Sequence, residues 1–420
     1  MQLLNEIIDH LTTVLFSLIA CISIIYFITT MVSVLVCRRK EAAPPVPDEQ
    51  LPTVTVQITS RNELVALDCA RCCMAFDYPE DKLQILLGDD SNNPNVMQEI
   101  DHFAENNPRV KVLRRTNRIG FKSGNLNNVN EHTTGEYILV MDSDFLPEPD
   151  FLRRLTAHAV ADPGLAAVQA RWHITDVHES LTTLLGSGII NVTHFIMLPL
   201  FGRFMKTCFL CGSAMLIKRQ AMVEMNGWET STMIEDVDLS FRFFINGYRL
   251  AYCPDVACDC EVPHTAHDLF RQQKRWAYGV VETALKRSRA LYTSREATLG
   301  NKVAATVVSS GYAVSFLVFI STMLGFLHMV LLGAGDMNSS LQTSVQGTLS
   351  NLWRIVISCG ALVATICAGF SSGFGKRGAV KLIFASYTVG FVMLFHVSNG
   401  IFRAVLHLPI DWVPPKKHGR

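Results

Sequence analysis

Acidic residues end two apolar, strand-like runs in the middle of this 420-residue chain. Asp142 and Asp144 follow the run 137–141, and Asp89 and Asp90 follow the sequence LQILLG. In open α/β sheets, ligands bind just beyond the carboxyl ends of the strands. A D-x-D pair in such a place can hold Mg²⁺ or Mn²⁺, because these ions bind one or two carboxylates together with substrate phosphate oxygens. For either pair taken alone, a solvated turn or a helix cap is the alternative interpretation.

Two further groups of residues have types suited to a transfer reaction. Glu235 and Asp236 precede an amphipathic pattern, where Asp236 could take a proton from an attacking hydroxyl or merely cap a helix. Gln272, Arg275 and Trp276 form a Q-x-x-R-W sequence. Arginine offers a planar donor fork for phosphate oxygens, and tryptophan offers a flat apolar surface for a sugar ring. The alternative for this segment is a basic interfacial helix anchored by Trp276.

Alternating strand and helix patterns must position these groups. We expect strands over residues 54–58, 83–91, 111–115, 136–142 and 165–174, separated by helices. Such alternation predicts a mainly parallel sheet with helices on both faces. No G-x-G-x-x-G sequence follows the first strand, which disfavours a dinucleotide-binding fold of the usual kind.

Apolar runs near both ends of the chain predict membrane helices. The run 11–37 is long enough to span a bilayer, and the basic sequence RRK that follows it indicates a cytoplasmic end. Three further spans are expected over 312–332, 353–370 and 379–406, with a basic cytoplasmic turn between the last two. This number of spans puts the tail outside, whereas its basic residues favour the cytoplasm, so the side of the tail stays open.

These patterns divide the chain into four parts. They are an N-terminal transmembrane helix (1–40), a linker (41–52), an α/β domain (53–295) and a C-terminal membrane domain with a short basic tail (296–420). The 37 basic and 37 acidic side chains balance, which argues against nucleic acid as a partner. The 12 cysteines are scattered, as expected of reduced thiols. We predict a multi-pass protein of the inner or plasma membrane whose α/β domain is cytoplasmic.

The order and separation of the acidic groups and the Q-x-x-R-W sequence resemble those of the processive family 2 glycosyltransferases, which include cellulose, mannan, chitin and hyaluronan synthases. Residues 117–127 are similar to the N-R…K-A-G-N-L-N segment of bacterial cellulose synthases, and FLCGS at 209–213 is similar to their F-F-C-G-S motif. VQARW at 168–172 resembles plant cellulose-synthase-like mannan synthases. Ile234 and Ser123 depart from the family's T-E-D and K-A-G, but they leave the charged groups in place.

The resemblance, which covers about residues 53–285, implies a GT-A fold and a role for each group. The implied contacts to the nucleotide sugar are Asp89, Asp90, Lys122, Asp142 and Arg275. The implied ligands of Mg²⁺ or Mn²⁺ are Asp142 and Asp144, and the implied catalytic residues are Asp236, as the base, and Glu235. The implied contacts to the acceptor are Trp276, Gln272, Cys211 and Gly212.

The implied activity is that of a membrane-bound inverting hexosyltransferase. It would elongate a cellulose- or mannan-like β-linked polysaccharide from a nucleotide-diphospho-sugar and extrude the product through its helices. UDP-glucose is the donor expected first, with GDP-mannose and UDP-N-acetylglucosamine behind it. The alternatives are a non-processive glycolipid synthase that transfers one sugar from a UDP-sugar to a lipid, and an inactive scaffold or transporter that retains the fold.

Overall fold

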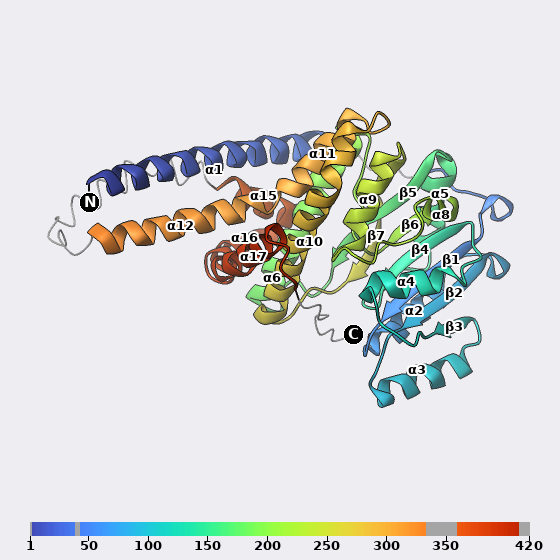
Figure 1. Cartoon of the computed structure of the whole chain (residues 1–420). Helices are drawn as coiled ribbons and strands as arrows, with labels where there is room; N and C mark the ends of the chain where they lie inside the picture. Colours follow the sequence, from blue (N-terminus) through green and yellow to red (C-terminus); the bar gives the residue numbers. More distant parts are fainter. Residues whose placement is uncertain (1, 38–42, 333–358, 411–420) are drawn as a thin grey trace.

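One mainly parallel sheet forms the centre of the protein. The structure is a computed structural model that describes residues 2–37, 43–332 and 359–410. The strands, in chain order, are β1 (Val54–Ser60), β2 (Leu83–Asp89), β3 (Val110–Leu113), β4 (Tyr137–Asp142), β5 (Leu165–Ile174), β6 (Met215–Lys218) and β7 (Arg249–Cys260). Their order across the sheet is β3-β2-β1-β4-β6-β5-β7 (Figure 1). Only β6 is antiparallel to its neighbours, β4 and β5, among the described strands.

Helices cover both faces of this sheet, which explains the continuous apolar runs in the sequence. Along β4, Leu139 packs on the face covered by α2 and α5, whereas Ile138 and Val140 pack on the face covered by α4 and α9. The helices of this domain are α2 (Val65–Met74), α3 (Pro94–Asn106), α4 (Phe121–Asn130), α5 (Phe151–Ala161), α8 (Arg219–Glu224), α9 (Glu235–Ile245) and α10 (Ala266–Thr293). Because successive strand side chains point to opposite faces, both cores draw on the same strands.

The strands β6 and β7 do not stand out in the sequence. β6 has only four residues, and β7 contains Pro254, which cannot donate a ladder hydrogen bond. β7 lies at the edge of the sheet, and its pairing with β5 shifts register between Ala170 and Arg171, opposite the segment that contains Pro254. Proline is tolerated at such edges and bulges. The five strands expected from the apolar runs are all present.

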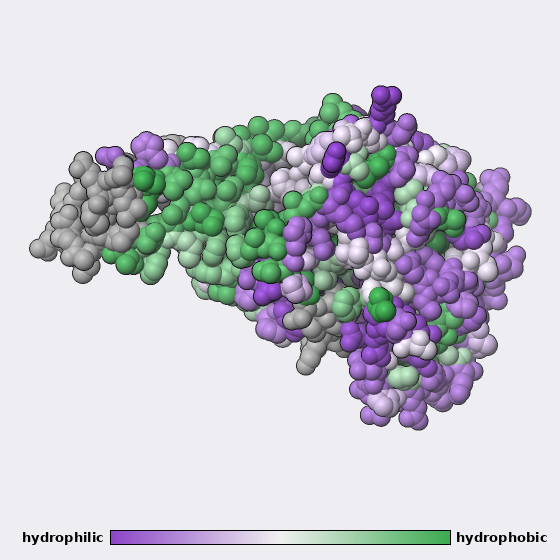
Figure 2. Space-filling model, viewed as in Figure 1, coloured by the Kyte–Doolittle hydropathy of each residue, from purple (hydrophilic) through white to green (hydrophobic). Residues whose placement is uncertain are grey.

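A second group of helices is apolar on the outside and extends away from the sheet. α1 (Gln2–Val36) and α12 (Ala313–Leu332) lie side by side and project from the domain (Figure 1). Between them and the sheet lie α6 (Leu181–Val192), α11 (Leu299–Ser310), α15 (Gly360–Ser371), α16 (Gly375–Tyr387) and α17 (Val389–Val405). Hydrophobic residues dominate the surface of the projecting helices, whereas the sheet domain is hydrophilic (Figure 2).

Three helical segments of the described chain are long and apolar enough to cross a membrane. They are Glu6–Val36, Leu181–Met205 and Leu299–Leu327, and the pair α16–α17 would add a fourth if it acted as one span. The first and third correspond to spans expected from the sequence. The sequence predicted the second segment only as a helix. About 67% of its most apolar part is buried inside the protein. It contains two π-helical stretches, Thr193–Met197 and Phe201–Met205, on either side of Pro199, which lacks a backbone N–H.

The expected span over 379–406 is bent in the structure and consists of two helices, which pass as one span only if they act together. α16 and α17 meet at an angle of 49°. Thr388, between them, donates its hydroxyl to the carbonyl of Phe384, and such side-chain bonds compete with the helical ladder. The basic residues at 376, 377 and 381 begin α16 instead of forming a turn. Of the expected span 353–370, the structure describes the 12-residue α15, and residues 353–358 and the expected loop 336–350 lie outside the described residues, as does the tail 414–420.

Candidate functional site

A cavity of about 490 Å³ lies where the carboxyl ends of β1, β2 and β4 meet α9 and α10. Its lining includes every site residue proposed from the sequence except Asp89: Asp90, Lys122, Asp142, Asp144, Cys211, Gly212, Glu235, Asp236, Gln272, Arg275 and Trp276. These residues are far apart in the chain. The parallel strands bring Asp90, Asp142 and Asp144 to one edge of the sheet. Helices α4, α9 and α10 and the segment before β6 bring the other residues to the same place.

Asp89 and Asp90 have different environments. The side chain of Asp89 is fully buried and pairs with Arg114 at 2.7 Å, so it ties β2 to the end of β3. Asp90 lines the cavity and accepts two hydrogen bonds from Arg115, at 2.8 and 2.6 Å. Only Asp90 is therefore placed to meet a ligand. Arg114 supports Asp89 and Arg115 supports Asp90, and the sequence interpretation did not single out either arginine.

Lys122, in the first turn of α4, joins three parts of the site. Its ammonium group lies 2.8 Å from Asp142, 2.8 Å from Glu235 and 2.8 Å from the carbonyl oxygen of Gly212. Burial opposes the charge of this ammonium, but the two carboxylates outweigh that effect and raise the pKa of Lys122 above its ordinary value. Lys122 thus stays charged and holds the end of β4 against the start of α9.

Asp236 is buried in the first turn of α9, beside Gly212. A Cβ atom on Gly212 would lie 3.1 Å from the Oδ2 atom of Asp236, and the φ of +87° at this position also favours glycine. Burial, followed by the charge of Glu235, raises the pKa of Asp236 to about 7, although Lys122 acts in the opposite direction. A carboxyl group of this kind can exchange a proton near neutral pH.

Close packing fixes α9 against α10. Gly279 of α10 lies so near Ile234 that an added Cβ would fall 2.2 Å from the Cγ1 atom of that side chain. Asp238, whose side chain is fully buried, pairs with Arg242 on its own helix at 2.7 Å and with Arg287 of α10 at 2.8 Å. The residue at the threonine position of the family's T-E-D therefore has a packing role that isoleucine fulfils.

Ser213 connects the FLCGS segment to two neighbouring strands. Its hydroxyl accepts the backbone N–H of Asp142 at 2.9 Å. Its carbonyl accepts Nε2 of Gln169 at 2.9 Å and Nε1 of Trp172 at 3.1 Å. Gln169 also accepts the N–H of Cys211 at 2.8 Å. The VQARW and FLCGS segments are therefore one hydrogen-bonded unit, and they line the cavity through Trp172, Cys211 and Gly212.

Arg275 and Trp276 reach the cavity from α10. Burial lowers the pKa of Arg275, while Glu235, Asp142 and Asp236 oppose this shift through their negative charges. Trp276 packs against the apolar cores on both faces of the sheet. The segment is helical, as the alternative interpretation also had it, and its helix lines the cavity, as the functional interpretation requires.

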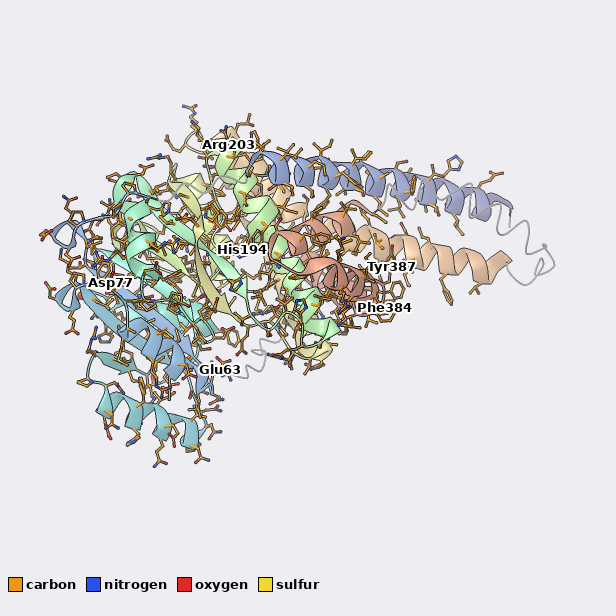
Figure 3. The ribbon with its side chains drawn as sticks, turned by 180° about the vertical axis from the view of Figure 1, so that it is seen from behind. Glu63, Asp77, His194, Arg203, Phe384 and Tyr387 are labelled. Atoms are coloured by element: carbon orange, nitrogen blue, oxygen red, sulfur yellow. The ribbon has the colours of Figure 1, made fainter. Side chains whose placement is uncertain are left out.

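His194 lines the same cavity and was not foreseen from the sequence, where it stands alone in an apolar run. It comes from the first π-helical stretch and lies where the helical segment meets the sheet (Figure 3). Its ring is 5.3 Å from that of Trp172 and 6.0 Å from that of Tyr252. Tyr252 donates its hydroxyl to the carbonyl of His194 at 2.6 Å. This aromatic group connects the site to the apolar helices.

Asp142 and Asp144 form a donor set that fits a hard divalent cation. Both carboxylates line the cavity at the end of β4, and Asp142 already accepts an ammonium group at 2.8 Å. Oxygen ligands of this kind suit Mg²⁺ or Mn²⁺ when phosphate oxygens complete the coordination.

The family model described as "Glycosyl transferase family group 2" matches residues 137–369, more than half of the chain. The chain belongs to this family. Among curated relatives, the probable glucomannan 4-beta-mannosyltransferase 11 of Arabidopsis thaliana is 31% identical over 266 residues, which is 61% of this chain and 60% of the relative. The probable glucomannan 4-beta-mannosyltransferase 7 of rice is 35% identical over 240 residues, or 55% of this chain and 41% of the relative. The chain thus spans about half the length of the curated relatives it matches.

A solved structure shares the fold across nearly the whole chain. It is the mannosyltransferase PcManGT from Pyrobaculum calidifontis in complex with GDP-Man and Mn²⁺, with a TM-score of 0.60 and 19% identity. The match covers 95% of this chain and 99% of that one. The family match and this likeness confirm the GT-A-like α/β domain with flanking apolar helices.

Proposed function

We propose that this protein is a membrane-bound inverting glycosyltransferase that builds a β-linked glycan from a nucleotide-diphospho-sugar. The observation that carries the proposal is the convergence of Lys122, Asp142, Asp236, Arg275 and Trp276 on one cavity. This set supplies a proton acceptor, positive charge for a departing diphosphate and an apolar surface for a sugar. Few other reactions would need all of them together.

GDP-mannose is the proposed donor, in place of the UDP-glucose expected first from the sequence. The curated relatives are named as mannosyltransferases, and the solved structure with the same fold holds GDP-Man and Mn²⁺. UDP-glucose has no comparable support among these relatives. Asp90, held by Arg115, is the proposed contact to the nucleoside, because it is the acid of the β2 pair that lines the cavity.

In the proposed mechanism, Asp236 takes the proton of the acceptor hydroxyl as that oxygen attacks the sugar. The buried position of Asp236 keeps its proton affinity near that needed at neutral pH. Arg275 and Lys122 stabilise the negative charge that develops on the diphosphate. A divalent ion held by Asp142 and Asp144 would add further positive charge at the same place. The site contains one base at the acceptor side, which favours a single displacement with inversion.

A lipid acceptor is the second candidate, and the apolar part of the cavity lining supports it. Away from the acids, the cavity continues between apolar helices and is lined by Ile189, Val192, Met197, Val314 and Val397. A polymer channel would be expected to offer more polar and aromatic side chains. Trp172, His194 and Tyr312 supply polar and aromatic side chains of this kind, and they support the polymer as the first candidate.

The membrane arrangement is also proposed. Three apolar helical segments and the membrane-facing surface of α1 and α12 support a multi-pass protein of the inner or plasma membrane. The basic sequence RRK after α1 supports a cytoplasmic α/β domain, where nucleotide sugars are available.

A panel of labelled donors tests the proposed function. Membranes that contain the protein would receive GDP-mannose, UDP-glucose or UDP-N-acetylglucosamine, and the products would be separated by size and by solubility in organic solvent. We expect incorporation from GDP-mannose into material that a β-mannanase degrades. A labelled lipid with a single sugar would select the second candidate, and no incorporation from any donor would contradict the proposal.

A further inference from the structure

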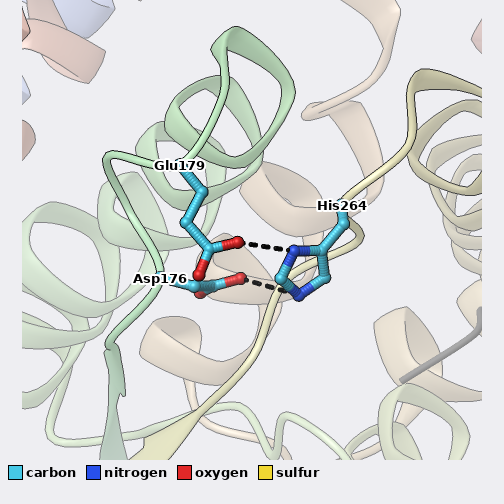
Figure 4. Close-up of side chains that lie close together, drawn as sticks. All are labelled: Asp176, Glu179 and His264. Carbon is cyan, nitrogen blue, oxygen red and sulfur yellow. Dashed lines mark ion pairs between the residues drawn. The ribbon is translucent and has the colours of Figure 1, made fainter. Parts of the chain in front are cut away.

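A cluster of ionisable side chains lies outside the proposed reaction centre, between two connecting loops. Asp176 and Glu179 come from the loop between β5 and α6, and His264 comes from the loop between β7 and α10 (Figure 4). Glu261, in the same loop as His264, also approaches it. Asp176, Glu179 and His264 do not line the cavity of the proposed reaction, whereas Glu261 lies at its border and lines it.

The distances in this cluster are those of a coordination site. One potential ligand atom from each of Asp176, Glu179 and His264 lies within 4.8 Å of the other two. The Nε2 atom of His264 is 3.3 Å from Asp176 and 3.7 Å from Glu261, and its Nδ1 atom is 2.8 Å from Glu179. In a tetrahedral zinc site with bonds of about 2.0–2.1 Å, neighbouring ligand atoms are separated by roughly 3.3 Å. The 3.3 Å distance between Nε2 and Asp176 fits this spacing, whereas the 2.8 Å between Nδ1 and Glu179 is that of a charge-assisted hydrogen bond. Binding of an ion at Nε2 therefore requires the exposed side chain of Glu179 to turn from Nδ1 toward the ion.

Asp176 is a buried acid whose negative charge a bound cation would neutralise. Its side chain is only 7% exposed. The Oδ2 atom faces His264 and accepts the N–H of Val262 at 3.5 Å, whereas the Oδ1 atom has no hydrogen-bond partner among the described residues. Three carboxylates surround a single imidazole, so even a protonated His264 would leave negative charge in excess. A buried carboxylate oxygen without a partner is costly, and a bound cation would satisfy it.

We propose that Asp176, Glu179 and His264 form a second metal site, which binds a divalent transition-metal ion of the Zn²⁺ class, with Glu261 next to it. Imidazole together with carboxylates suits Zn²⁺ and similar ions, whereas Mg²⁺ favours oxygen ligands alone. This site is therefore chemically distinct from the aspartate pair at the end of β4. The inference does not depend on the proposed transferase activity.

An ion in this position would link two elements that shape the cavity. Ser180 caps the start of α6, and Thr265 caps the start of α10. The ligands lie immediately before these caps, so the ion joins the two helix starts. α10 carries Gln272, Arg275 and Trp276, so we assign the ion a positioning role for that helix.

Metal content tests the site directly. The full chain, purified in detergent and stripped with a chelator, would be dialysed against Zn²⁺ and analysed for bound zinc by mass spectrometry. We expect one zinc ion per chain that His264→Ala abolishes. Glu179→Gln, at a side chain that is 58% exposed, should weaken binding by about tenfold or more without disturbing the fold. The matched control is His267→Ala in the first turn of α10, whose side chain is 74% exposed and which should retain the ion.

A variant of the aspartate pair at the end of β4 shows which of the two sites binds the zinc. Asp142→Asn combined with Asp144→Asn should retain the zinc. Loss of zinc in that variant, or unchanged zinc in both His264→Ala and Glu179→Gln, would overturn the proposal. It would also be overturned if the wild-type chain held no zinc and its melting temperature did not rise with Zn²⁺, since the cluster would then be an ion-pair network only. Circular dichroism of each variant identifies a misfolded chain, and the exposed Glu179 variant then decides the outcome.

Discussion

Asp236 is a carboxyl group whose surroundings oppose its ionisation. It is buried beside Glu235, and both factors raise its pKa, to about 7. A base must be deprotonated to accept the acceptor proton, so its protonated form is inactive. The rate of the proposed sugar transfer should therefore depend on pH in the physiological range. An aspartate that titrates in this range is uncommon.

The first prediction concerns this dependence. We expect kcat/KM to fall about tenfold per pH unit below about 7, because Asp236 becomes protonated there. Glu235→Gln should move this acid limb to lower pH, since it removes a negative charge that raises the pKa of Asp236. The measurement is the pH profile of sugar incorporation for both proteins. An identical profile in the two would contradict the coupling.

The second prediction concerns Lys122. Its ammonium contacts two carboxylates and a carbonyl, so Lys122→Gln leaves Asp142 and Glu235 without their cation. Removing one partner from a buried ion cluster costs about 3–5 kcal/mol of unfolding free energy. We expect a clear drop in melting temperature in detergent, measured by circular dichroism. Lys111→Gln, on the exposed side of β3, should melt like the wild type.

At the scale of elements, the contact between α9 and α10 determines where Asp236 stands. The third prediction is that Gly279→Ala, whose Cβ would meet Ile234 at 2.2 Å, pushes the start of α9 out of place. Overpacking of this kind costs about 1–3 kcal/mol and should lower activity strongly. Ile234→Ala in the same chain should restore part of it, because the obstructing side chain is gone. Gly202→Ala, with nothing within 4 Å of its added Cβ, is the control.

Elements with strong apolar runs could be predicted from the sequence, and the others could not. β1, β2 and β4 are buried on both faces, and their runs are long enough to stand out. β6 has four residues and depends on its two neighbours for stability. The bend at Thr388 likewise lies inside an apolar pattern that otherwise continues, so the sequence gives no signal for it.

The same distinction applies to the site. The acids could be found because they follow strand-like runs or begin a helical pattern. The Q-x-x-R-W sequence could be assigned a role because its order relative to these acids resembles that in family 2 glycosyltransferases. The separation of Asp89 from Asp90 could not be predicted, since it depends on which arginine each one meets. His194 gives no signal as a lone histidine in an apolar run, and it reaches the cavity only because the helical segment packs against Trp172.

At the scale of the whole molecule, one cavity runs from the acidic strand ends to the apolar helices. Its lining draws on α1 through Tyr26, on α12 through Ser315 and on α17 through Val397. A donor would be bound by the sheet domain, and an acceptor or product would lie between the helices. Side chains from several segments line the donor end of the cavity, which explains why the sequence alone does not identify the nucleotide sugar.

The fourth prediction separates these two halves. Ser315→Phe should fill the helical part of the cavity and leave the donor part intact. We expect shorter or fewer products at an unchanged KM for GDP-mannose, measured by gel filtration of the labelled product and by initial rates. Ser310→Phe, at an exposed position of α11 outside the cavity lining, should have no such effect. A raised KM for the donor in Ser315→Phe would contradict this division.

The most direct test of the account is sugar transfer by the purified full chain and its Asp236→Asn variant, each in lipid nanodiscs with labelled GDP-mannose and Mn²⁺. Asparagine preserves the size of the side chain but cannot accept the proton. The account predicts incorporation by the wild type and a loss of at least about a hundredfold in the variant, with donor binding retained. Equal incorporation by the two proteins would contradict it.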